Sequence, residues 1–166
     1  MGMVGNYFRT DIETVNKIKC GELSLVELCY SEDDFMDSDS FMYLDKSWHA
    51  IHFILSGEVW TSTDDPLSKV VLNGNILNDE DMGYGPAMVL MPDELHDINK
   101  ALKVTTKEWF LEEFSITDMI ANEIYPVMND ENADDFFEYI YHYFAELVDF
   151  FKKAEQENQC ILFFVN

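Results

Sequence analysis

The sequence predicts an α+β fold in a single domain, residues 1–166: a small mixed sheet that contains both terminal strands, with several helices packed around it. Two apolar runs predict the terminal strands, Met3–Phe8 and Cys160–Val165. The second run is continuously apolar, as is typical of a strand buried on both faces. Between them, residues 133–157 repeat apolar side chains at helical spacing, which predicts a helix about 37 Å long.

Local signals place the elements that follow the first strand. Gly5, within that strand, allows a neighbouring group to approach closely. Residues 10–13 form a capping box, which predicts a helix that ends near Gly21. Residues 22–30 fit either a short helix or a strand, and the polar stretch from Glu32 to Ser40 is expected to be a loop.

The segment from Asp45 to Gly57 is the most informative part of the chain. It predicts a helix with Asp45 as its N-cap and with Gly57 ending it in the left-handed conformation. At about 3.6 residues per turn, Trp48 and His52 share one apolar face and point toward the interior. His49 lies toward the flank of that face.

The middle of the chain alternates turns with short elements. Residues 67–72 fit no single type of element, and residues 78–82 are expected to form an acidic loop. Glycines flank Tyr84 on both sides, which predicts a tight turn that presents this tyrosine. Two further helices are predicted, one with Pro92 in its first turn and one after a capping box at residues 105–108.

The charge of the chain excludes several classes of partner. Of its 166 residues, 33 are Asp or Glu and 10 are Lys or Arg, which gives a formal net charge of −23. Nucleic acids and anionic lipid surfaces would be repelled, because both are recognised through clustered Lys and Arg. A basic protein would be attracted, and its encounter with the chain would be faster. The simpler interpretation of the same charge is that it keeps the protein soluble.

Cysteine usage and hydropathy predict a soluble cytoplasmic protein. Cys20, Cys29 and Cys160 lack metal-ligand spacing and are expected to be reduced thiols. No cationic segment followed by an apolar run opens the chain, so no secretory leader is expected, and no apolar stretch approaches the ~20 residues that a membrane span needs. The sequence predicts no cofactor and leaves the oligomeric state open.

Motifs spread along the whole chain carry a family resemblance. They are the opening Met-Gly-Met-Val-Gly, the helix from Asp45 to Gly57, Asp65–Ser68, Gly83–Ala87, Phe114–Ile116 and Glu123–Pro126. In this order they resemble the bacterial YfbM-like family. The resemblance implies one α/β domain of bacterial cytoplasmic origin. It implies no reaction, because that family is a domain of unknown function without assigned catalytic residues.

No catalytic residue is identified, but a set of side chains is a candidate pocket: Asp45, Trp48, His52, Tyr84, Glu123 and Tyr125. His52 is either a core histidine or a proton donor and acceptor at the floor of a cleft. His49 and His52 are spaced for one metal ion, but no third ligand has a motif spacing, so no metal site is predicted. Glu123 and Tyr125 fit either a rigid turn or a carboxylate beside a phenol.

Two classes of function follow from these features. The leading hypothesis is a non-enzymatic binding protein, similar to a regulator or an immunity factor, for a basic protein partner. The alternative is a small hydrolase or transferase with a pocket around Trp48 and His52, which requires that Tyr84, Glu123 and Tyr125 converge on the same concavity. A structural homo-oligomer is a third interpretation, and its sign would be an exposed apolar patch on the long helix.

Overall fold

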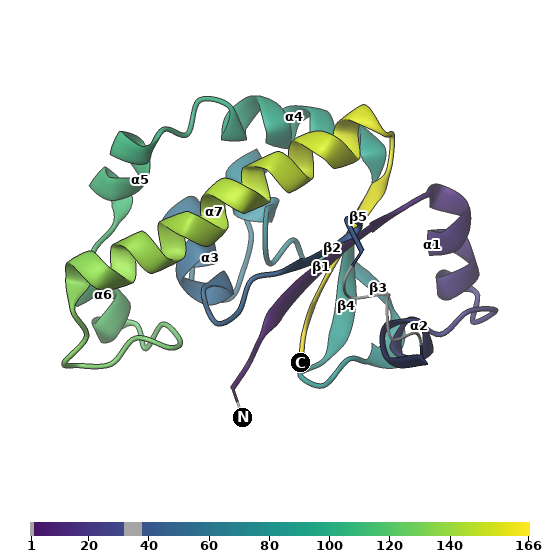
Figure 1. Cartoon of the computed structure of the whole chain (residues 1–166), viewed down its shortest axis with the longest axis horizontal. Helices are drawn as coiled ribbons and strands as arrows, with labels where there is room; N and C mark the ends of the chain where they lie inside the picture. The colour runs from purple at the N-terminus through teal and green to yellow at the C-terminus, as the bar shows by residue number, and fades with distance from the viewer. Residues whose placement is uncertain (1, 32–37) are drawn as a thin grey trace.

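A computed structural model describes residues 2–31 and 38–166, and within them one sheet separates two groups of helices (Figure 1). Its five strands have the order β2-β1-β5-β4-β3. The elements are β1 (Gly5–Thr10), α1 (Ile12–Lys19), α2 (Leu25–Ser31), β2 (Phe41–Tyr43), α3 (Trp48–Ser56), the 3-10 helix η1 (Pro66–Lys69), β3 (Ile76–Asp81), β4 (Pro86–Leu90), α4 (Pro92–Leu102), α5 (Lys107–Glu113), α6 (Ile116–Ala121), α7 (Ala133–Gln156) and β5 (Cys160–Val165).

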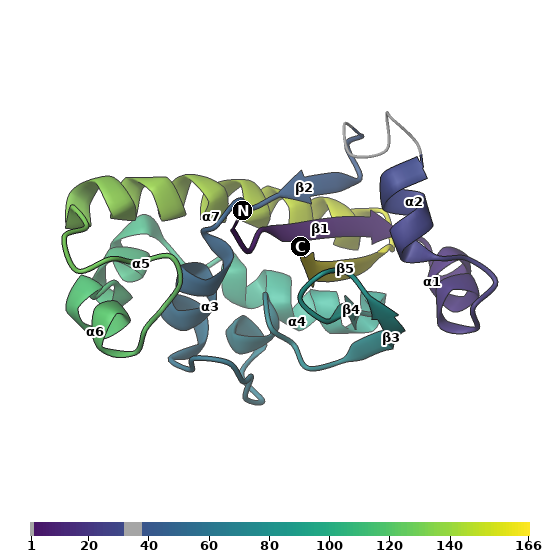
Figure 2. The same cartoon turned by 90° about the horizontal axis from the view of Figure 1, so that it is seen from below.

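The two terminal strands pair with each other at the centre of the sheet. β1 and β5 are antiparallel along their whole length, from Gly5 opposite Val165 to Thr10 opposite Cys160. Just outside this ladder the backbones of Val4 and Asn166 exchange two hydrogen bonds, of 2.8 and 3.0 Å, so the chain ends lie close together (Figure 2). The predicted α+β class and the inclusion of both terminal strands in one sheet are confirmed.

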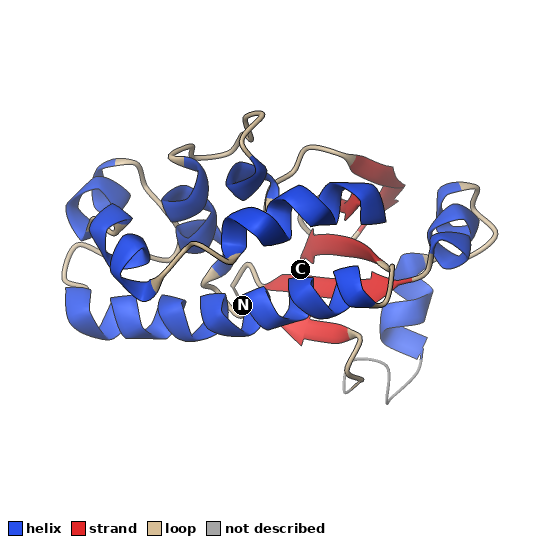
Figure 3. Cartoon of the chain, turned by 90° about the horizontal axis from the view of Figure 1, so that it is seen from above, coloured by secondary structure: helices blue, strands red, loops and turns tan. Residues whose placement is uncertain are grey.

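One detail of the predicted sheet differs. A mixed sheet was expected, whereas every strand pair in the described part of the chain is antiparallel. Parallel neighbours require a crossover that returns the chain to its starting edge. Here the chain leaves β4 through α4, α5 and α6 and returns along α7, which crosses over the strands (Figure 3). As a result, β5 runs antiparallel to both β4 and β1.

Alternation along the strands divides the apolar core between the two faces of the sheet. On one face Tyr7 and Phe163 belong to the large cluster formed with α3 to α7. On the other face Phe8, Leu162 and Phe164 belong to the smaller cluster formed with α1 and α2. Successive side chains of a strand point to opposite faces, so the continuous apolar run at the C-terminus fills both layers.

The acidic stretch predicted as a loop is a strand. Residues 78–82 fall largely in β3, an edge strand that pairs with β4. Charged side chains on an edge strand discourage pairing with other chains, which accounts for the polar composition. Glu80 also has a local role, because its carboxylate accepts hydrogen bonds from the Ser24 hydroxyl and from the Leu25 N–H, at the start of α2.

The other elements agree with the sequence except at some of their ends. α1 begins one residue later than predicted, with Asp11 as its N-cap. The ambiguous residues 22–30 are largely helical in α2, and residues 67–72 begin in η1. The helices with Pro92 in the first turn, after the capping box at 105–108 and at 133–157 are confirmed as α4, α5 and α7. The expected loop from Glu32 to Ser40 lies mostly outside the described residues.

The single arginine of the chain stabilises the fold. Arg9 lies on β1 and is 3 % exposed. Its guanidinium donates to Glu157 at 2.5 Å, to Gln159 at 2.6 Å and to the carbonyl of Asp39 at 3.0 and 3.2 Å. Every contact joins the sheet to a neighbouring segment, so Arg9 is not available to an external anion.

No helix of the described residues is long and apolar enough to cross a membrane.

The close approach predicted at Gly5 is confirmed, and its neighbour is Trp48. A Cβ atom at position 5 would lie 2.7 Å from the Trp48 Cβ and 2.9 Å from its Cγ. Gly5→Ala is therefore expected to lower the free energy of unfolding by about 1–3 kcal/mol, because β1 and α3 must move apart. Urea denaturation followed by far-UV circular dichroism measures the loss.

Gly57→Ala is the comparison variant for this prediction. Gly57 has open space around its Cα and a φ of 70°, so only the left-handed conformation should cost stability, by about 1 kcal/mol. Tryptophan fluorescence of the folded protein should shift in Gly5→Ala and not in Gly57→Ala. An unchanged urea midpoint for Gly5→Ala would contradict the steric role of this glycine.

Candidate functional site

Helix α3 places its aromatic and imidazole side chains in the interior. Trp48 is 2 % exposed and His52 is 1 % exposed, so the predicted inward orientation of both is confirmed. His49 is also buried, although the sequence placed it toward the flank. The helix ends as predicted, with Gly57 in the left-handed conformation.

Asp45 is not the N-cap of this helix. The cap position belongs to Ser47, whose hydroxyl donates to the carbonyl of Leu44 at 2.6 Å. Asp45 has a φ of 49°, and its carboxylate accepts hydrogen bonds from the phenols of Tyr139 at 2.9 Å and Tyr43 at 3.5 Å. Burial and the Asp45 carboxylate raise the pKa of Tyr139. Asp45 therefore connects α3 to α7 instead of capping α3.

His49 is held between two indoles and uses both ring nitrogens. Its ring centroid lies 5.0 Å from that of Trp48 and 4.2 Å from that of Trp60. Nδ1 accepts the backbone N–H of Tyr125 at 3.0 Å, so Nε2 carries the proton and donates to the carbonyl of Val59 at 2.8 Å. Burial lowers the pKa of His49, so the ring is neutral and ties three segments together.

His52 is enclosed by the fold. Its Nε2 lies 3.0 Å from the carbonyl of Thr61, to which it donates, and its Nδ1 has no partner among the described residues. Burial lowers the pKa of His52 to about 4. The Ser56 hydroxyl donates to the carbonyl of His52 at 2.7 Å. A neutral imidazole that opens into neither groove described below has no path to a substrate proton.

Two neighbouring grooves meet at Met3 and Trp60. The first, the Tyr84 groove, has a volume of about 310 Å³, and its other lining residues are Trp48, Leu72, Tyr84, Pro86, Met88, Phe163, Phe164 and Val165. The second, the Glu123 groove, has a volume of about 690 Å³, and its other lining residues are Ile120, Glu123, Ile124, Tyr125, Pro126, Val127, Met128, Asn129 and Asp130.

Local interactions fix the walls of both grooves. The indole of Trp48 donates to the carbonyl of Met3 at 3.1 Å, and the phenol of Tyr125 accepts the Met3 N–H at 3.1 Å. In the turn after β3, the Asp81 carboxylate accepts the N–H groups of Gly83 and Gly85 at 2.9 and 3.0 Å. This turn leaves Tyr84 58 % exposed, so the predicted presentation of this tyrosine is confirmed.

The structure divides the candidate pocket residues between three places. Trp48 and Tyr84 line the first groove, whereas Glu123 and Tyr125 line the second. Asp45 and His52 line neither. The two grooves adjoin, since the ring centroids of Trp48 and Tyr125 lie 6.5 Å apart, but His52, which the hydrolase or transferase alternative requires in the same concavity, lines neither of them.

Trp60 is the residue of this region that the sequence interpretation missed. It is 59 % exposed and contacts both grooves, and its ring packs on His49. It lies in the irregular segment between α3 and η1, where no periodic pattern draws attention to it. The available signal was its composition: a tryptophan in a polar connection, Glu58-Val59-Trp60-Thr61-Ser62, has no core position to fill.

The fold and these grooves define an α+β protein with an aromatic-lined surface. The chain belongs to the family described as Domain of unknown function (DUF1877), whose model matches residues 1–164. The predicted family resemblance is thereby confirmed. The crystal structure of YfbM, a protein of unknown function from Escherichia coli, is similar, with a TM-score of 0.76 and 22% identity over 98% of this chain and 99% of that chain. No curated protein matches the chain.

Because His52 is buried, we expect the free energy of unfolding to decrease in acid. Its pKa of about 4 in the fold is below the ordinary value of 6.5, so the unfolded chain binds this proton first as the pH falls. Between pH ~7.5 and ~5, this residue should reduce the free energy of unfolding by about 2 kcal/mol. In His52→Gln the stability difference between the two pH values should shrink by about that amount, measured by urea denaturation.

His142→Gln provides the matched control. His142 lies on α7 with 66% of its side chain exposed, so its replacement should leave the pH dependence of the wild type unchanged. If His52→Gln loses as much stability as the wild type between these pH values, His52 is not the group that titrates.

Proposed function

We propose that this chain is a non-enzymatic binding protein of the cytoplasm that receives a basic protein partner on the surface around Trp60. One observation carries the proposal: a half-exposed tryptophan stands between two grooves, with Tyr84 and Met128 also exposed beside it. Aromatic and methionine side chains are enriched where proteins bind one another, and tryptophan often supplies a large part of the binding energy.

The charge near these grooves supports a cationic partner. Glu123 and Asp130 line the Glu123 groove, and no lysine or arginine lines either groove among the described residues. The formal net charge of −23 would attract a basic protein from a distance, and the apolar walls would then hold its side chains. A lysine or arginine placed on Trp60 would gain a cation–π contact as well.

The other two interpretations receive less support. The hydrolase or transferase interpretation relies on His52 as the proton donor or acceptor of the pocket, whereas His52 is enclosed and neutral. A homo-oligomer built on the long helix needs exposed apolar side chains there, and none of the large hydrophobic residues that the structure describes as exposed lies on α7. The free thiols of Cys20, Cys29 and Cys160 are compatible with a reducing compartment.

An affinity capture experiment tests the proposal. The tagged chain is incubated with a bacterial lysate at about 0.05 M and about 0.5 M NaCl, since salt shortens the range of electrostatic attraction. A basic protein is expected at low salt and should be lost at high salt. Trp60→Ala should weaken its binding by about 30-fold, equivalent to about 2 kcal/mol, when affinity is then measured by calorimetry.

Charge and location controls sharpen this test. Glu123→Gln with Asp130→Asn should slow association, because the attraction near the groove is reduced. Leu111→Ala removes an exposed apolar side chain on α5, away from both grooves, and should bind as the wild type does. An empty eluate, a partner insensitive to salt, or full binding by Trp60→Ala would each refute the proposal.

A further inference from the structure

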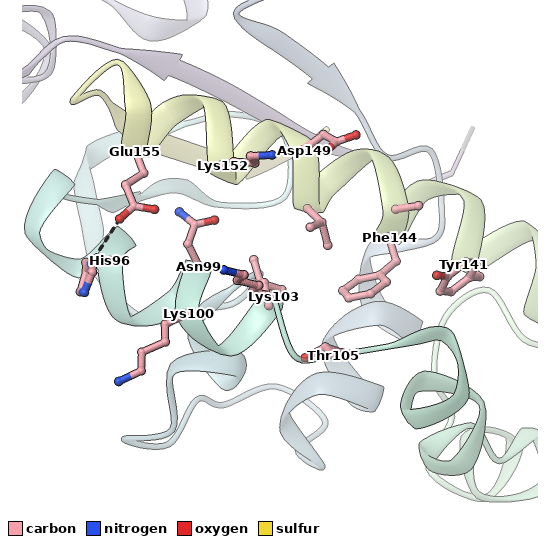
Figure 4. Close-up of a pocket in the computed structure, with 13 residues that line it drawn as sticks. His96, Asn99, Lys100, Lys103, Thr105, Tyr141, Phe144, Asp149, Lys152 and Glu155 are labelled. Atoms are coloured by element: carbon pink, nitrogen blue, oxygen red, sulfur yellow. Dashed lines mark hydrogen bonds and ion pairs between the residues drawn. The ribbon is translucent and has the colours of Figure 1, made fainter.

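A separate groove lies between the helices α4 and α7 (Figure 4). Its volume is about 690 Å³, within the range of pockets that hold small organic ligands. Leu102, Phe144 and Val148 form its apolar lining. Asn99 holds the two helices together, because its amide donates to the carbonyl of Phe151 at 3.0 Å.

Three lysines line this groove, in a chain that has only 10 Lys and Arg residues. Lys100 lies in the last turn of α4 and Lys103, three residues later, is the C-cap of that helix, while Lys152 lines the groove from α7. In Figure 4, Lys103 lies at the end of α4, Lys152 lies along α7 beside Asp149, and Lys100 extends away from α7. All three are exposed, so each side chain can reorient toward a ligand.

The ammonium groups of these lysines are not neutralised by the fold. No ion pair joins Lys100, Lys103 or Lys152 to a carboxylate of the described residues. Four cations of the chain are paired, Arg9 with Glu157, Lys17 with Glu13, Lys107 with Glu138 and Lys153 with Asp39, whereas Lys19, Lys46 and Lys69 also form no ion pair with a described residue but do not line this groove. In a protein with 33 acidic residues, unpaired lysines gathered along one groove are a departure from the general charge distribution.

Two carboxylates also line the groove, and one of them is engaged. Glu155 accepts a hydrogen bond from Nδ1 of His96 at 3.0 Å, at the end of the groove near the start of α4. Asp149 lies on α7 between Val148 and Lys152. Among the lining residues the three lysines therefore outnumber the two carboxylates.

Helix dipoles explain only part of this arrangement. Lysines near a helix C-terminus are stabilised by the carbonyl groups there, which accounts for Lys100 and Lys103 at the end of α4. The dipole does not select the face on which they lie. Lys100 and Lys103 line the same concavity as Leu102, Phe144 and Lys152, so positive charge and apolar surface occur together there.

We infer that the groove between α4 and α7 binds an amphipathic anion, with a carboxylate or phosphate head held by Lys103 and Lys152 and an apolar body laid over Leu102, Phe144 and Val148. Lys100 closes on the head from the edge. Ammonium groups bind such heads as point charges, and the aliphatic stems of the lysines extend the apolar lining. This site is independent of the Trp60 surface.

Fluorescence titration with 8-anilinonaphthalene-1-sulfonate, an amphipathic anion, tests the site on the full chain. The Lys103→Gln/Lys152→Gln variant should bind the probe at least about tenfold more weakly than the wild type, because two charge-assisted contacts are lost. Lys19→Gln/Lys69→Gln makes the same change in net charge at two lysines outside the groove and should bind as the wild type does. Equal affinity of the two double variants would overturn the inference.

Two further arms locate the site and identify the head. Ala145 is exposed in the groove, so Ala145→Trp should fill it and abolish probe binding without lowering the thermal unfolding midpoint. Decanoate and decyl phosphate should displace the probe, and the stronger competitor identifies the preferred head. Displacement by decanol as effective as by either anion, or probe binding retained in Ala145→Trp, would refute the site. Trp60→Ala should leave the titration unchanged.

Discussion

The antiparallel pairing of β1 with β5 is the constraint on which the rest of the structure depends. It joins the first and last elements of the chain at the centre of the sheet, so the segments between them must cover the two faces that this pair presents. Tyr7 and Phe163 direct one face toward α3 and α7, and Phe8 and Leu162 direct the other toward α1 and α2. Gly5 lets Trp48 pack directly on β1, which fixes α3 and therefore the wall shared by its indole and Met3.

Much of this fold could be predicted from the sequence, because its strongest signals are long or continuously apolar segments. The helix at residues 133–157 carries a continuous apolar stripe, and Cys160–Val165 is too apolar for anything but a central strand. The acidic strand β3 could not be predicted in this way. Its residues fit a loop locally, and only pairing with β4 and capping of α2 by Glu80 make it a strand. The prediction of Asp45 as an N-cap was wrong for a similar reason, since its carboxylate binds the phenol of Tyr139, which is distant in the sequence.

Of the candidate site, the sequence predicted only the orientation of the two buried side chains, Trp48 and His52. The spacing of Trp48 and His52 on one helical face is a local property, so their inward orientation followed from periodicity. Whether Tyr84, Glu123 and Tyr125 join them depends on the path of the chain around Trp60, which no pattern in the sequence encodes. The lysines at 100, 103 and 152 were equally invisible as a group, because α4 and α7 are distant in the sequence and their faces meet only in the fold.

The net negative charge of the molecule attracts the partner proposed for the Trp60 surface and repels the anion proposed for the groove between α4 and α7. A basic partner approaching Trp60 is drawn by the net charge of −23, so long-range attraction helps its encounter. An anion approaching the groove between α4 and α7 is repelled until it comes within about a Debye length of the lysines. Short-range contacts must then offset that repulsion, and burial of an apolar body on Leu102, Phe144 and Val148 supplies them. A small inorganic anion has no such body, which is why the groove is suited to an amphipathic ligand.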